Sequence, residues 1–219
     1  MKKYLELLQT LPLFRNVAQQ ELEPLLGCLS ARYAHYKKEQ FLLLAGDAVS
    51  WVGIVLCGSV QVLKEDAQGN TMILTELGVG DLFAETFACA AVEKSPVTVV
   101  ASADCDVLLI DYRRIITTCP SSCVFHSRLI ENMLRIMAKK NMFLNSRIEI
   151  VSKRTTREKI LAYLELQRGQ KQSDSFDIPF SRQQLADFLC VERSALSREL
   201  SNMREEGLLQ FQKNHFILL

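Results

Sequence analysis

The sequence predicts an α+β protein in which a domain of short β-strands precedes one long helix and a small unit of helices and strands. Three observations support this fold class. Short apolar runs alternate with glycine-containing turn pairs between about residues 31 and 111, which is typical of a small β-sandwich or barrel. From Val124 to Val151 the apolar residues follow a helical period. After Ser181 the chain shows two short amphipathic helices and then two apolar runs.

The composition is that of a folded protein without a strong overall charge. Of 219 residues, 48% are hydrophobic and 23% are charged, which is enough apolar material for a core and argues against disorder. Lys and Arg number 26 against 25 Asp and Glu, so a basic surface for nucleic acid must be local. We find no secretory signal, and the apolar runs are too short to span a membrane. The seven scattered cysteines fit reduced thiols in a cytoplasmic protein.

The β-domain and the helices before it are predicted from apolar spacing. Two opening helices are expected where leucines recur at helical spacing: Leu5, Leu8 and Leu11, then Leu22, Leu25, Leu26 and Leu29. Strands are expected in the runs of Val, Ile, Leu and Phe: Phe41–Leu44, Val52–Leu56, Val60–Leu63, Met72–Leu77, Val97–Ala101 and Val107–Ile110. Glycine supplies the positive φ of the turns between them: Gly46-Asp47, Gly58-Ser59, Gly69-Asn70 and Gly80-Asp81.

The long helix carries a heptad seam with one polar member. Its positions are Ile130, Leu134, Met137, Asn141, Leu144, Ile148 and Val151. A helix of about 42 Å is longer than the core of a small domain. Its apolar stripe is therefore expected to pack against the same helix of a second copy of the chain. The alternative is an amphipathic helix packed within one chain, and we favour the homodimer because three consecutive heptads are kept. A second stripe is expected to face the β-domain: Leu129, Met133, Ile136 and Phe143.

The segment after the long helix is expected to be a joint, a helix and a loop. Residues 152–156 are polar and form the joint. Ile160, Leu161 and Leu164 then indicate an amphipathic helix. A polar loop is expected from Gln170 to Asp177.

The C-terminal segment predicts two crossing helices. Ser181 can cap the first helix, and Gln184 three residues later completes a capping box. Ala186 is small enough to let a second helix, from about Glu192 to Arg204, cross closely. Between them Cys190-Val191 marks a short turn.

The second of these helices is suited to reading DNA. Its outer face is polar, and arginine there can donate two hydrogen bonds to a guanine edge in the major groove. Two strands follow, joined near Lys213-Asn214, and would place a wing tip near phosphates. The predicted DNA contacts are Ser181, Arg182, Gln183, Arg193, Ser194, Ser197, Arg198 and Lys213. The alternative is a helix pair inside a core with solvated arginines.

The order and spacing of these segments resemble the CRP/FNR superfamily of bacterial transcription regulators over essentially the whole chain. The residues that carry the resemblance are Leu13-Phe14, Gly46-Asp47 to Gly58-Ser59-Val60, Gly80–Glu85, the long helix and Ser181–Arg198. The resemblance implies a cyclic-nucleotide-binding-like β-roll (a double-stranded β-helix or jelly roll), a dimerisation helix and a winged helix-turn-helix. The expected ranges are residues 1–122, 123–152 and 153–219.

The resemblance also implies partners. A homodimer would bind double-stranded DNA at a palindromic operator with half-sites about one helical turn apart. RNA polymerase is a further partner if the protein activates transcription. Recognition helices of the family often contain Glu-x-x-Ser-Arg; Ser197 and Arg198 match, but Ser194 replaces the glutamate, so the half-site is expected to differ. Cys190 and Glu192 depart too, standing where glycine and a capping Ser or Thr are common. We see no catalytic motif and expect no enzyme.

The effector pocket implied by the resemblance departs from the cyclic-nucleotide pattern. Glu85 matches the ribose-binding glutamate, but Ala84 replaces the usual glycine before it. Ser95 stands where the family has a phosphate-binding arginine. Lys94 beside it carries a positive charge but cannot donate the two parallel hydrogen bonds of a guanidinium group. We therefore expect a small effector other than cyclic AMP, with this candidate lining: Phe83, Glu85, Lys94, Ser95, Asn141 and Asn145. The alternative is that Glu85 and Lys94 are solvated or paired structural residues.

A cysteine-based redox sensor on the same scaffold is the competing interpretation. Cys119, Cys123 and His126 lie close together at the start of the long helix, where a thiol pKa can be lowered. A metal would need a fourth ligand, which is not evident, so no metal site is expected. An iron–sulfur cluster near the N-terminus is not expected, because Cys28 is the only cysteine before Cys57.

Overall fold

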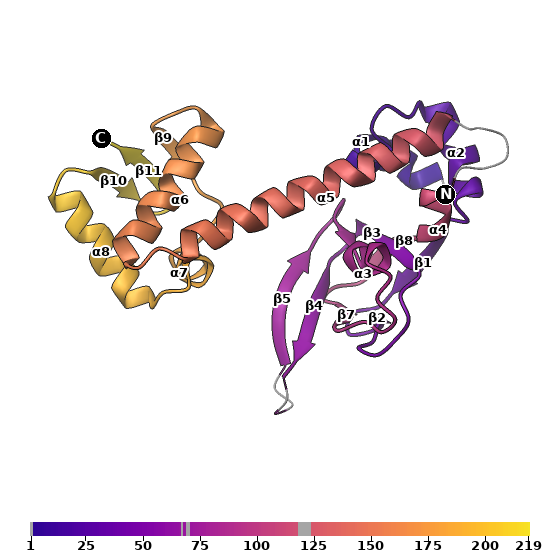
Figure 1. The fold of residues 1–219 in the computed structure, drawn as a ribbon, viewed down its shortest axis with the longest axis horizontal. Coiled ribbons are helices and arrows are strands. Elements are labelled where there is room, and N and C mark those ends of the chain that lie inside the picture. Colours follow the sequence, from indigo (N-terminus) through magenta and orange to yellow (C-terminus); the bar gives the residue numbers. More distant parts are fainter. Residues whose placement is uncertain (1, 67, 69–70, 118–123) are drawn as a thin grey trace. The chain divides into compact units, whose positions relative to one another are not determined.

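The computed structural model describes residues 2–66, 68, 71–117 and 124–219, which divide into two units, residues 1–138 and 139–219. Figure 1 labels the helices and strands of each unit. The boundary between the units falls inside the long helix α5 (Val124–Val151), whose bounds agree with those predicted from the sequence. The three-part division of the chain expected from the sequence stays a prediction.

The first unit begins with short helices that bury their leucines. These are η1 (Lys2–Tyr4), α1 (Leu5–Thr10), η2 (Pro12–Phe14) and α2 (Gln19–Cys28). Leu8, Phe14 and Leu22 are completely buried against the sheets that follow. Two further short helices, α3 (Glu85–Cys89) and α4 (Tyr112–Ile116), were not predicted.

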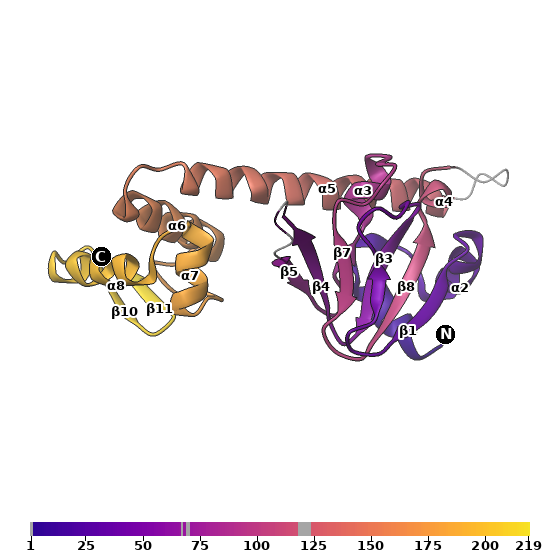
Figure 2. The same ribbon diagram turned by 90° about the horizontal axis from the view of Figure 1, so that it is seen from below.

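Two four-stranded antiparallel sheets form the β-roll of this unit (Figure 2). One has the order β1-β8-β3-β6, with bounds Arg32–Tyr36, Cys105–Asp111, Trp51–Cys57 and Leu82–Phe83. The other has the order β2-β7-β4-β5, with bounds Phe41–Leu43, Thr98–Ala101, Val60–Glu65 and Thr71–Leu77. Both sheets contribute to one core, so the predicted α+β class and β-domain are confirmed.

Two glycines of the roll have positive φ for different reasons. Gly58, between β3 and β4, has φ +73, and a Cβ placed there would lie 2.1 Å from the Asp104 carbonyl oxygen. Gly46 has φ +96, but nothing lies within 4 Å of the same position. Gly58 is therefore required both by backbone conformation and by a close backbone contact, whereas Gly46 is required by conformation alone.

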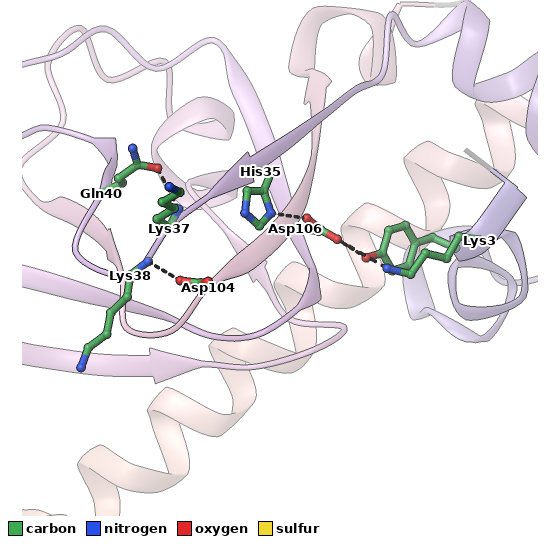
Figure 3. A network of polar contacts seen from close by, with 8 residues as sticks. Lys3, His35, Lys37, Lys38, Gln40, Asp104 and Asp106 are labelled. Atoms are coloured by element: carbon green, nitrogen blue, oxygen red, sulfur yellow. Dashed lines mark hydrogen bonds and ion pairs between the residues drawn. The ribbon is translucent and has the colours of Figure 1, made fainter.

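A polar network attaches the N-terminal segment to the roll (Figure 3). Asp106 on β8 accepts a hydrogen bond from the Tyr4 hydroxyl, lies 2.7 Å from His35 Nδ1 and 3.9 Å from Lys3 Nζ. The hydrogen bonds from Tyr4 and His35 hold the pKa of Asp106 below its usual value. Nearby, the Lys38 backbone N–H donates to Asp104 over 2.8 Å. The contacts of Asp106 with Lys3 and Tyr4 hold the η1 segment against the paired strands β1 and β8.

The second unit contains the C-terminal part of α5, a helix and a winged helix pair. Its further elements are α6 (Thr156–Lys171), β9 (Ser175–Asp177), α7 (Arg182–Leu189), α8 (Arg193–Glu205), β10 (Leu209–Gln212) and β11 (His215–Leu218). The three strands form an antiparallel sheet in the order β10-β11-β9. The polar loop predicted from Gln170 to Asp177 is wrong in part, because α6 continues to Lys171 and β9 pairs with β11 through buried Phe176.

Among the described residues, no helix combines the length and apolar character that crossing a membrane demands. The longest, α5, has charged and polar residues along its whole length.

Candidate DNA-binding, effector and dimer sites

The start of α7 is fixed by the predicted capping box. The Gln184 backbone N–H donates to Ser181 Oγ over 3.3 Å, and the Ser181 backbone N–H donates to Gln184 Oε1 over 2.8 Å. Gln183 is exposed and its side chain donates to Asp187 over 2.8 Å. These bonds satisfy backbone donors that a helix start would otherwise leave unpaired.

The turn between α7 and α8 is held by a left-handed cysteine and a lysine. Cys190 has φ +52, the conformation that explains why glycine is common at this position. The Lys159 ammonium donates to the carbonyl oxygens of Leu189 and Cys190 over 3.2 and 3.4 Å. A cation at the C-terminal end of a helix is favourable for the helix dipole, so Lys159 supports the angle at which α8 leaves the turn.

The polar face of α8 is turned to solvent. Leu196, Leu200 and Met203 are completely buried beneath it. The four residues predicted to contact DNA from this helix are all exposed: Arg193, Ser194, Ser197 and Arg198. Glu192 precedes the helix without a side-chain cap hydrogen bond, which agrees with its departure from the usual Ser or Thr. The arrangement leaves two guanidinium groups available for a ligand outside the protein.

An ion-pair network holds α8 against α6, which the sequence did not reveal. Arg157 donates from Nε to Glu199 over 2.5 Å and from its two terminal nitrogens to Glu206 over 2.6 and 2.8 Å. The hydrogen bonds raise the pKa of Arg157 and hold the pKa of Glu206 below its usual value. A bidentate pair of this kind restrains geometry as well as adding energy, so it fixes the C-terminal end of α8.

The wing is supported by Arg182. Its guanidinium lies 5.0 and 5.5 Å from the ring centres of Phe211 and Phe216, and it donates to the Lys213 carbonyl oxygen over 3.1 Å. Burial lowers the pKa of Arg182. Arg182 is half-buried and its guanidinium makes these contacts within the unit; its predicted role as a DNA contact stays a prediction. Lys213 is exposed at the turn between β10 and β11, with φ +54.

Two predicted effector residues, Phe83 and Glu85, lie in the interior of the roll. Phe83 is 2% exposed and packs edge-on against Trp51 with ring centres 5.7 Å apart. Glu85, 4% exposed, begins α3 and accepts a 3.3 Å hydrogen bond from the Thr86 hydroxyl. Ala84 before it has φ +63, which accounts for the glycine usual in the family. Phe83 is thus a core residue, and Glu85 is a buried carboxylate.

Ser95, which stands at the position of the missing arginine, lies in a loop, and its hydroxyl already has a hydrogen-bond partner. Ser95 is 3% exposed and its hydroxyl donates to the Val97 carbonyl oxygen over 2.7 Å. Its backbone pairs with Gly46 and Asp47. Lys94 is exposed. Asn141 and Asn145 belong to the second unit, where the Asn145 amide donates to the Asn141 side chain over 2.9 Å.

The heptad seam of α5 is largely open to solvent in the single chain. Leu134, Leu144 and Ile148 are 64%, 53% and 60% exposed, Asn141 is exposed, and Ile130 and Met137 are half-buried. Leu129, Met133 and Ile136 pack on the roll as predicted. Phe143 belongs to the second unit, where its ring centre lies 6.4 Å from that of Phe188. An exposed leucine and isoleucine stripe of this regularity is typical of a surface that a second helix covers, and the homodimer stays a prediction.

The structure describes only one of the three residues of the predicted redox group. Cys119 and Cys123 lie outside the described residues, and His126 is 2% exposed with its Nδ1 unpaired among the residues described. Burial raises the pKa of the Cys89 and Cys105 thiols, which makes them less nucleophilic. Within the described part of the chain, no three His, Cys, Asp or Glu side chains are placed to hold a metal ion. The redox interpretation stays a prediction.

Comparison with known proteins agrees with both units. The cyclic nucleotide-binding domain family matches residues 33–121, and the Crp-like helix-turn-helix domain family matches residues 158–219. The cAMP-activated global transcriptional regulator CRP of Haemophilus influenzae is 23% identical over 188 residues, covering 80% of this chain and 78% of that protein. These domains together define a DNA-binding transcription regulator with a cyclic-nucleotide-binding-like domain. The chain belongs to the CRP/FNR superfamily, whose members are non-enzymatic.

Solved structures share the fold. The c-di-GMP responsive global regulator CLP of Xanthomonas campestris superposes with a TM-score of 0.57 at 17% identity, covering 90% of this chain and 98% of that one. DNR from Pseudomonas aeruginosa gives a TM-score of 0.53 at 16% identity over 100% and 95% of the two chains. The sequence-based assignment to the superfamily and the predicted fold are confirmed.

Proposed function

We propose that this protein is a cytoplasmic homodimer that binds a palindromic DNA site and whose affinity for that site is controlled by a small effector, other than cyclic AMP, bound in the β-roll. The observation that carries the proposal is the exposed polar face of α8, with Arg193 and Arg198 free of ion pairs to any described residue. If the protein activates transcription, RNA polymerase is its further partner.

The DNA-binding part rests on how the winged unit presents its side chains. Arg193, Ser194, Ser197 and Arg198 leave α8 on the face opposite its buried leucines, as a helix inserted into a major groove requires. Arginine can bind both acceptors of a guanine edge. Ser181 and Lys213 line one surface cavity of about 500 Å³ at the start of α7 and the wing tip, where a phosphate could be met. We assign Arg182 the role of holding the wing.

The effector part rests on the interior of the roll. Glu85 keeps the carboxylate that can bind a ribose hydroxyl, yet Ser95 is a short side chain whose hydroxyl is already bonded to a backbone carbonyl. A cyclic phosphate buried there would lack a guanidinium partner, and an unpaired buried charge is strongly disfavoured. These two positions therefore favour a ligand without a cyclic phosphate.

Cyclic AMP is accordingly expected to leave DNA affinity unchanged. Titration calorimetry of the full chain should show no micromolar binding, and fluorescence anisotropy with the preferred operator should give the same dissociation constant with and without the nucleotide. Micromolar binding that tightens the DNA complex would contradict the pocket assignment while leaving the DNA-binding assignment intact.

Replacing Arg198 by alanine is expected to cost about 1–3 kcal/mol of specific DNA affinity and to relax one base position, because a bidentate guanine contact is lost. The measurement is competition binding with the preferred site and its single-base variants. Arg32→Ala removes the same charge from an exposed position on β1 and serves as the control. Unchanged affinity of the Arg198 variant would show that α8 is not the reading helix.

One selection experiment tests the whole proposal. DNA bound by the protein is selected from a random pool, once alone and once with extracted metabolites. A palindromic consensus whose enrichment changes with the metabolites is expected. Enrichment without any sequence preference would count against the proposal.

A further inference from the structure

Two basic residues of α6 contact the helix-turn-helix on either side of its second helix. The Arg157 guanidinium donates to Glu199, in the middle of α8, and to Glu206, at its C-terminal end, over 2.5 to 2.8 Å. The Lys159 ammonium donates over 3.2 Å to the carbonyl oxygen of Leu189, at the end of α7. Neither basic residue was predicted to contact DNA, yet both bind the elements that support α8.

The two carboxylates that Arg157 binds share one side of α8, beside the exposed arginines. Glu199 and Glu206 are seven residues apart, which is about two helical turns. Arg198 precedes Glu199 by one position and is therefore turned from it by about 100° around the helix. Neither Arg193 nor Arg198 has an acidic residue three or four positions away on α8, where helix neighbours pair. The ion-pair network is thus adjacent to the polar face without occupying it.

Glu199 makes the position of α8 dependent on Arg157. The side chain of Glu199 is only 22% exposed, whereas that of Glu206 is 45% exposed. A partly buried carboxylate that loses its cation is unfavourable, so without Arg157 the helix is expected to move until Glu199 reaches water. A bidentate contact between arginine and a base requires alignment to within about 0.5 Å. A small displacement of α8 is therefore enough to weaken the contact predicted for Arg198.

We propose that Arg157 is a positioning residue for DNA recognition, which holds α8 through Glu199 and Glu206 and so aligns Arg198 with its base without touching DNA itself. The inference rests on the proposed role of α8 as the helix that reads DNA. Arginine suits this task because one planar guanidinium donates to both carboxylates in fixed directions, which an ammonium group does not. Arg157 therefore determines sequence preference, whereas general affinity for DNA comes from contacts elsewhere.

The test compares the affinity of the full chain for its preferred site with that for an unrelated duplex of the same length. Fluorescence anisotropy at several salt concentrations gives both dissociation constants. Arg157→Ala should weaken binding of the preferred site about tenfold and binding of the unrelated duplex by less than about twofold, because phosphate contacts remain. The slope of affinity against salt should stay the same, whereas loss of a residue that binds phosphate itself would lower it by about one.

Three further variants show whether Arg157 acts through α8. Arg168→Ala removes the same group from the far end of α6, where it pairs with Glu165, and should leave both affinities unchanged. Glu206→Gln removes one half of the network from an exposed position, is expected to fold normally, and should weaken the preferred site about threefold. In an Arg198→Ala background, Arg157→Ala should cost less than about threefold, because the contact that it aligns is already lost.

The outcomes separate this inference from the proposed function. Wild-type affinity of Arg157→Ala and Glu206→Gln for the preferred site, together with weakened binding by Arg198→Ala, would overturn the positioning role and leave the role of α8 intact. An equal loss on both duplexes with a lower salt slope would make Arg157 a direct phosphate contact and also overturn it. If Arg198→Ala itself binds as the wild type does, the proposed reading helix is refuted, and the role of Arg157 with it.

Discussion

Replacing Leu144 by aspartate is expected to convert the proposed homodimer into monomers. Leu144 is 53% exposed in the single chain, although it stands in an unbroken heptad seam. In a two-fold dimer each substitution appears twice, and an unpaired charge buried in the seam costs about 3–5 kcal/mol. The dissociation constant of the dimer should rise by at least about 100-fold. Sedimentation velocity over a range of concentrations measures it directly.

The matched control for this experiment is Met142→Asp. Met142 is 68% exposed and lies on the same helix, but two residues away and thus on nearly the opposite side. The same chemical change there should leave the dimer intact, whereas Leu134→Asp should act like Leu144→Asp. A Leu144 variant that sediments as the wild type does would show that the stripe is not a dimer seam.

Replacing Gly58 by alanine is expected to destabilise the β-roll by about 2–5 kcal/mol. The added Cβ would lie 2.1 Å from the Asp104 carbonyl oxygen and 2.9 Å from Cys105 Cα, so backbone must move. The positive φ of Gly58 adds the conformational cost of a side chain in the left-handed region. Urea unfolding followed by the fluorescence of Trp51, the single tryptophan, reports on this unit selectively.

Gly46→Ala separates the two causes. Gly46 also has positive φ, but a Cβ there meets nothing within 4 Å. Its variant should lose only the conformational part, about 1–2 kcal/mol. Equal losses for the two variants would mean that the backbone around Asp104 yields without cost and that the close contact is unimportant.

The fold could be predicted where burial leaves a clear pattern in the sequence. Val52–Leu56 forms a continuous apolar run because the centre of β3 is fully buried, and α5 could be predicted because its seam is regular. Strand β1 was missed because Arg32–Tyr36 is exposed or half-buried throughout. Strand β9 was taken for a loop, since Phe176 is its only inward residue.

The candidate DNA-binding site could be predicted only where helical spacing reveals it. The exposed side chains of α8 follow from helical spacing alone, since Leu196 and Leu200 define the opposite face. The role of Arg182 could not be found in this way, because its partners Phe211 and Phe216 lie far along the chain and meet it only after folding. Arg157 was missed for the same reason, as Glu199 and Glu206 are separate from it in sequence.

The stacking of Arg182 has a consequence for the thermodynamics of DNA recognition. The guanidinium already joins the two hydrophobic strands of the wing to its tip through the Lys213 carbonyl before any DNA is present. Backbone that is ordered in the free protein loses little entropy when a complex forms. The hairpin should therefore behave as a preorganised element, with affinity gained through a smaller ordering penalty and with little induced fit on contact with phosphates.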